Sequence, residues 1–83
     1  MSLALMVRRD IHAARQILAR NLRRFRLDRG LTQEELANAA GLRQALISEL
    51  EAGKLDVRLD TLSRVAIALD ATLAELFHES KRG

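Results

Sequence analysis

The sequence predicts a single all-helical domain, because three features of the 83-residue chain point to packed helices. Apolar residues recur at three- and four-residue spacings, the period of an amphipathic helix, and no segment alternates like a strand. The chain contains no proline, so nothing interrupts a series of helices. Its only aromatic residues are two phenylalanines, and its core must therefore consist of leucine, isoleucine, valine and alanine.

The first predicted helix is the longest and begins near Asp10, a favourable N-cap residue. Gly30 ends it, since glycine readily adopts the left-handed conformation that follows many helices. Its apolar residues form one stripe, at Ile11, Ala14, Leu18, Leu22 and Phe25.

Two short helices are predicted next, with a tight turn between them. Thr32 and Glu35 form a capping box that opens the second helix, and Gly41 ends it. Leu42 then returns to the core, and residues 44–52 form the third helix. Two short helices joined by a turn that contains glycine define a helix-turn-helix.

The last two predicted helices span residues 59–69 and a short segment that ends at Phe77. Thr72 and Glu75 form a second capping box at the start of this segment. The expected core of the domain comprises Leu22, Phe25, Leu36, Leu42, Ile47, Leu50, Leu62, Val65 and Leu69.

Composition argues against several functional classes. The chain has no cysteine, and its two histidines, His12 and His78, lack neighbouring ligands, so we expect no metal site. We expect no enzyme and no cofactor, because no catalytic constellation or glycine-rich phosphate loop is present. No apolar run approaches the roughly 20 residues needed to span a bilayer, and we expect a cytoplasmic protein.

The net charge of +3 is unevenly distributed. Residues 1–30 contain eight arginines against two aspartates, whereas residues 31–83 contain six basic against nine acidic residues. A basic first third suits nucleic-acid phosphates, an anionic membrane or an acidic protein. The alternative is a solvated helix face that binds nothing.

Several motifs at fixed spacing carry a resemblance. The segments GLTQEELA (30–37), AGL (40–42), IS (47–48) and EAGK (51–54) resemble the helix-turn-helix of the phage lambda repressor and Cro proteins, the XRE family. The likeness extends over about residues 17–77, and it implies a compact five-helix, repressor-like DNA-binding domain at residues 17–78. Residues 1–16 are then an N-terminal extension, whose first three residues are a candidate expression-vector remnant, and residues 79–83 are a polar tail.

The resemblance also implies which residues contact DNA. The expected base-reading residues lie on the third helix and are Gln44, Ala45, Ser48 and Glu49. The expected phosphate-binding residues are Gln33, Arg43, Lys54 and Arg58. A buried salt bridge between Arg26 and Glu51 is expected to join the first helix to the third.

The sequence departs from the family pattern at several helix ends. Arg43 and Arg58 stand where the family usually has a small hydroxyl cap, Val57 replaces a common proline, and Ala52 replaces a common asparagine. Two lost caps could cost roughly 1 kcal/mol each. The two arginines could instead contact phosphate.

The resemblance implies a transcriptional regulator of double-stranded DNA that reads the major groove with residues 44–51, as a homodimer on a palindromic operator. The expected dimer surface is the fourth helix, the fifth helix or the apolar N-terminal extension. Near the C-terminus, spare apolar surface is expected at Leu73, Leu76 and Phe77. The alternative is an antitoxin-type module that neutralises a toxin and regulates its own operon. Phage repressors, restriction–modification controllers and antitoxins all remain open.

Overall fold

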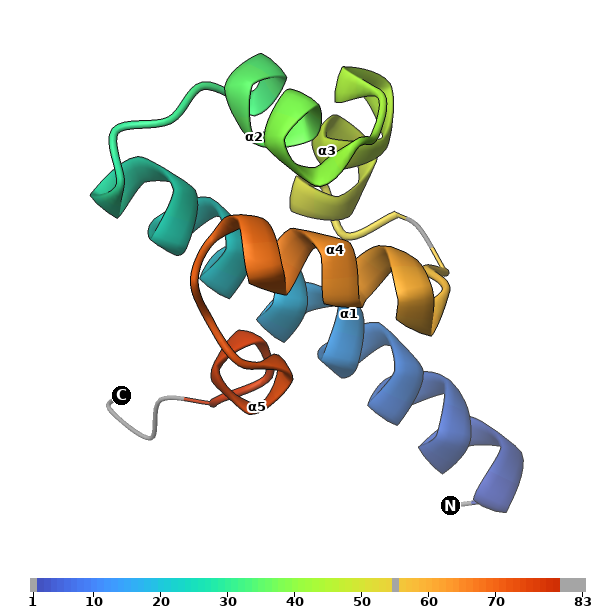
Figure 1. The fold of residues 1–83 in the computed structure, drawn as a ribbon. Helices are drawn as coiled ribbons and strands as arrows, with labels where there is room; N and C mark the ends of the chain where they lie inside the picture. The colour runs from blue at the N-terminus through green and yellow to red at the C-terminus, as the bar shows by residue number, and fades with distance from the viewer. Residues whose placement is uncertain (1, 55, 80–83) are drawn as a thin grey trace.

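The computed structural model describes residues 2–54 and 56–79, and its described residues form helices and connecting turns. The elements are α1 (Leu3–Asp28), α2 (Gln33–Ala40), α3 (Gln44–Glu51), α4 (Leu59–Ala68) and α5 (Leu73–Leu76). Figure 1 shows α4 across the middle of α1, with α2 and α3 on one side of α4 and α5 on the other. The predicted five-helix, all-α class is confirmed.

Helix α1 begins earlier than the sequence suggested. The Ser2 hydroxyl accepts a hydrogen bond from the Leu5 amide at 3.2 Å, and the helix then runs through Asp10 without interruption. The prediction of Asp10 as N-cap is therefore wrong. The seven residues from Leu3 onward include leucine, alanine, methionine and arginine, all strong helix formers, so a helix can begin well before Asp10.

The turn between α2 and α3 depends on Gly41, whose φ of +70° lies in the left-handed region. Its amide donates to the Asn38 carbonyl at 3.2 Å, and the Leu42 amide donates to the Ala37 carbonyl at 2.8 Å. This paired arrangement closes the end of α2 and turns the chain. Leu42 consequently packs, partly buried, against the core, as predicted.

The core receives side chains from all five helices. Its buried members are Leu18, Leu22, Leu36, Ala37, Ile47, Leu50, Leu62, Val65, Ala66, Leu69 and Leu76. Seven of the nine predicted core residues belong to this cluster, and the other two, Phe25 and Leu42, pack partly buried at its edge. The helical period therefore identified the inward faces correctly.

A buried asparagine holds α5 against α1. The Asn21 side-chain amide donates to the Leu76 carbonyl and to the His78 carbonyl, both at 2.8 Å. These bonds satisfy backbone carbonyls that the end of a short helix would leave without partners. Leu76 is completely buried, so the expectation that it supplies spare apolar surface is wrong, whereas Phe77 remains 41% exposed.

Among the described residues, no helix is both long enough and apolar enough to cross a bilayer.

Candidate nucleic-acid interface

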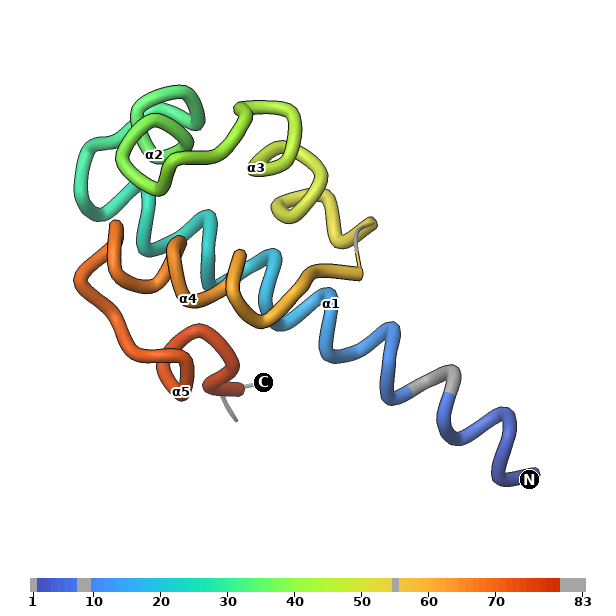
Figure 2. The backbone as a smooth tube through the Cα atoms, turned by 45° about the vertical axis from the view of Figure 1, so that its right-hand side comes forward, coloured from blue at the N-terminus to red at the C-terminus, as the bar shows by residue number. Residues whose placement is uncertain are grey.

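Helix α3 has one buried face and one exposed face. Ile47 and Leu50 are at most 2% exposed, and they pack α3 onto α1 and α2. All four residues expected to contact bases are exposed on the other side of the helix: Gln44, Ala45, Ser48 and Glu49. Figure 2 shows α3 at the surface, joined to α2 by the short turn. The fold therefore presents one side of α3 to an external ligand.

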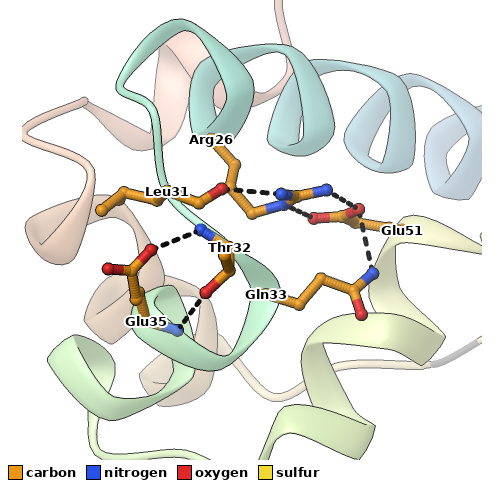
Figure 3. Close-up of polar contacts among 6 residues, drawn as sticks. All are labelled: Arg26, Leu31, Thr32, Gln33, Glu35 and Glu51. Atoms are coloured by element: carbon orange, nitrogen blue, oxygen red, sulfur yellow. Dashed lines mark hydrogen bonds and ion pairs between the residues drawn. The ribbon is translucent and has the colours of Figure 1, made fainter.

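A bidentate ion pair joins α1 to the end of α3, as Figure 3 shows. Arg26 Nε lies 2.6 Å from Glu51 Oε2, and Arg26 Nη2 lies 3.0 Å from Glu51 Oε1. The two side chains are 10% and 6% exposed. The third nitrogen, Arg26 Nη1, donates to the Leu31 carbonyl at 2.7 Å. The hydrogen bond with Glu51 raises the pKa of Arg26, so the guanidinium stays charged.

Glu51 also receives a hydrogen bond from α2. The Gln33 side-chain amide donates to Glu51 Oε1 at 3.2 Å, and the Gln33 amide oxygen points away from the carboxylate (Figure 3). Residues from α1, α2 and α3 thus meet at one carboxylate. The resemblance anticipated the Arg26 contact, but nothing local in the sequence indicated the link from Gln33 to Glu51.

Two capping boxes fix the starts of α2 and α5, as predicted. At α2 the Glu35 amide donates to the Thr32 hydroxyl at 3.0 Å, and the Thr32 amide donates to the Glu35 carboxylate at 2.9 Å. Thr72 and Glu75 repeat this pattern at α5. The backbone hydrogen bond from each threonine lowers the pKa of its glutamate. Each carboxylate therefore stays charged beside a helix N-terminus, where negative charge is favourable.

Three exposed basic residues flank the helix-turn-helix. Arg43 is the N-cap residue of α3 and Arg58 that of α4, and neither side chain makes a capping hydrogen bond. Lys54 follows the end of α3, so α3 has a basic residue just beyond each end. The guanidinium groups of Arg43 and Arg58 do not cap their own helices. In the described part of the chain, no three potential metal ligands lie together.

Comparisons with known proteins match this geometry. A family model described as Helix-turn-helix matches residues 22–76, which include all of α2 to α5. A hypothetical transcription factor of Neisseria meningitidis serogroup B is 36% identical over 67 residues, 81% of this chain and 63% of that protein. The control protein C.SmaI of Serratia marcescens is 37% identical over 62 residues, 75% of this chain and 74% of that protein.

The fold also matches a solved controller protein. The restriction–modification controller C.AhdI of Aeromonas hydrophila superposes with a TM-score of 0.75 at 35% identity, over 78% of this chain and 98% of that one. The family match covers more than half of the chain and contains the whole exposed face of α3. The chain belongs to the Helix-turn-helix (HTH_3) family, the XRE-type transcriptional regulators, which have a DNA-binding fold and are not enzymes.

Proposed function

We propose that this protein is a sequence-specific transcriptional regulator that inserts α3 into the major groove of its operator. The observation that carries the proposal is the division of α3 into a buried apolar face and an exposed face of small and polar side chains. A major groove about 12 Å wide admits one helix, and small side chains let the helix approach the base edges closely.

The side chains on this face suit particular base edges. The Gln44 amide can pair bidentately with adenine N6 and N7, and the Ser48 hydroxyl can bond to several bases. Ala45 can contact a thymine methyl group. Glu49 can accept from cytosine N4, although its charge repels nearby phosphates. We therefore assign base reading chiefly to Gln44, with the other three residues refining the sequence.

The residues proposed to bind phosphate lie around this face and are Gln33, Arg43, Lys54 and Arg58. All three basic residues are exposed, and the side chains of Arg43 and Arg58 make no capping hydrogen bond at their own helices. Gln33 uses one amide hydrogen on Glu51 and keeps the second for a phosphate oxygen. Such contacts fix the orientation of the protein on DNA without reading sequence.

We further propose that the regulator acts as a homodimer on a palindromic operator. A single domain offers one recognition helix and hence few base contacts, whereas a two-fold dimer doubles them across two half-sites. Similarity to the control protein C.SmaI, the controller protein C.AhdI and a hypothetical transcription factor supports a regulatory role. Such a role requires the protein to share a compartment with its DNA.

The decisive experiment begins with selection of bound sequences from a random DNA pool, followed by salt titrations on the selected operator and on scrambled DNA. Gln44→Ala should weaken operator binding by about 1–3 kcal/mol and leave scrambled DNA unaffected. Lys54→Ala should weaken both alike and make the salt dependence shallower by about one unit of slope. Arg23→Ala, which removes an exposed charge from α1, is the control for net charge.

Two outcomes would count against the proposal. Equal operator affinity for Gln44→Ala and the wild type would show that α3 does not read bases through this side chain. If the wild type itself fails to separate operator from scrambled DNA, the antitoxin-type, partner-binding function replaces regulation by sequence recognition.

A further inference from the structure

An open hollow lies where the turn between α2 and α3 meets the first half of α3, a region that Figure 2 shows at the surface. Its volume is about 410 Å³. Its lining residues are Gly41, Leu42, Arg43, Ala45, Leu46 and Glu49. Three of these residues, Arg43, Ala45 and Glu49, already have proposed contacts with DNA. The hollow is therefore part of the surface assigned to the operator.

Much of the lining is apolar. Leu42 and Leu46 are both half-buried, since each packs against the core and also lines the hollow. Ala45 is exposed beside them. At 100° per residue, Leu46 lies about 60° around α3 from Glu49, so it borders the exposed face of the helix. Apolar surface therefore reaches the edge of a face whose other side chains are small or polar.

The charged residues of the hollow do not favour an ionic occupant. Arg43 and Glu49 contribute one charge of each sign to the lining. A phosphate oxygen attracted by Arg43 would be repelled by Glu49, and the leucines offer it no hydrogen bond. Apolar surface is instead stabilised when an apolar group removes it from water. The hollow therefore suits a small apolar group.

The major groove presents one such group. On the edges of the four unmodified bases, the C5 methyl of thymine is the apolar group, and the other groups are hydrogen-bond donors and acceptors. We propose that the hollow seats the C5 methyl group of one operator thymine, and that Leu46 is a specificity-determining residue alongside Gln44. Leu42 and Ala45 complete the contact. This inference rests on the insertion of α3 proposed above and names one base that α3 reads.

The first test is a uracil scan of the selected operator with the wild-type protein. Uracil lacks the C5 methyl of thymine and keeps its hydrogen-bonding groups, so each replacement removes one methyl group from the groove. Burial of one such group changes an affinity about fourfold. At least one thymine in a half-site should therefore bind about fourfold more weakly as uracil. The scan needs no change to the protein, so it does not depend on the folding of a variant.

The second test connects the responsive thymine to Leu46. The ratio of thymine to uracil affinity is measured within each protein, so a uniform loss of affinity cancels. Leu46→Ala should lower this ratio from about four towards one, whereas Leu46→Met keeps an apolar side chain of similar volume and should retain it. Leu27→Ala, which removes a 54% exposed leucine from α1, is the matched control and should also retain the ratio.

The third test separates the methyl group from the rest of thymine. The responsive base pair is replaced by cytosine–guanine and by 5-methylcytosine–guanine. These two operators differ only by a C5 methyl group, and thymine O4 is absent from both. The operator with 5-methylcytosine should bind about fourfold more tightly than the one with cytosine. Equal affinities would assign the uracil effect to the shape of the DNA and overturn the methyl contact.

Two further results overturn the inference. One is an operator in which no thymine responds to uracil replacement, and the other is a thymine-to-uracil ratio that Leu46→Ala leaves unchanged. Base reading by α3 survives either result if Gln44→Ala still weakens binding to the operator alone. A wild type that does not separate operator from scrambled DNA overturns both the methyl contact and the proposed function.

Discussion

One carboxylate, that of Glu51, determines how three helices meet. It accepts two hydrogen bonds from Arg26 on α1 and one from Gln33 on α2. Because Glu51 is the last residue of α3, these bonds fix the end of α3 relative to both neighbours. The orientation of the exposed face of α3 therefore depends on a buried ion pair.

Truncation of this carboxylate should be among the most destabilising single changes in the chain. Glu51→Ala leaves the Arg26 guanidinium buried without its counter-charge, and loss of one partner of a buried pair costs about 3–5 kcal/mol. Urea denaturation should show this loss. Glu51→Gln keeps the volume and one acceptor, so it should fall between Glu51→Ala and the wild type. An unfolding free energy of Glu51→Ala within error of the wild type would contradict the structural role.

At the residue scale, the contacts anticipated from the sequence are those that a known motif carries. The Arg26–Glu51 pair was anticipated from the family motif, not from spacing. The bond from Gln33 to Glu51 joins positions 18 apart, and those from Asn21 join positions 55 and 57 apart. Such amide contacts depend on tertiary geometry and leave no periodic signal in the chain. The DNA-contacting roles stay predictions until binding is measured.

At the scale of the element, helix boundaries followed from chemistry that is visible in the sequence. The capping boxes at Thr32 and Thr72 and the turn at Gly41 lie where they were predicted. The predicted start of α1 was wrong although Asp10 suits an N-cap better than a helix interior. Most of the residues before it are strong helix formers, and Ser2 caps the helix, so α1 runs through Asp10.

The N-cap of α3 allows a test of the uncapped arginine. Arg43→Ser supplies a hydroxyl to an exposed helix end and should raise the free energy of unfolding by about 1 kcal/mol. It should also weaken operator binding, because a proposed phosphate contact is lost. Arg43→Gln is the matched control: it removes the charge without supplying a hydroxyl cap, so affinity should fall while stability does not rise.

Thermal melts and operator titrations of both Arg43 variants give the two readouts. Full operator affinity in Arg43→Ser would remove Arg43 from the phosphate-binding set. If Arg43→Ser is no more stable than the wild type, the lack of a side-chain cap at the start of α3 does not destabilise this fold.

At the scale of the whole molecule, the packed body of five helices and the exposed N-terminal part of α1, residues 3–11, form for different physical reasons. The body forms because five apolar stripes close around one core, and periodicity alone was enough to identify most of that core. The surplus apolar surface was expected partly at Leu76, but α5 folds back and buries this side chain beneath the Asn21 bonds. The surplus lies mainly on the N-terminal part of α1, which belongs to the extension named among the three expected dimer surfaces.

A rigid two-fold dimer on DNA requires a fixed spacing between its two half-sites. Two recognition helices of a two-fold dimer contact half-sites about one turn apart, roughly 10 base pairs or 34 Å. Insertion of about five base pairs between the half-sites rotates one of them to the opposite side of the duplex. Wild-type affinity should then fall to that of a single half-site. Fluorescence anisotropy on the native and expanded operators measures the two affinities. Wild-type binding that is insensitive to the insertion would mean that each copy recognises its half-site alone.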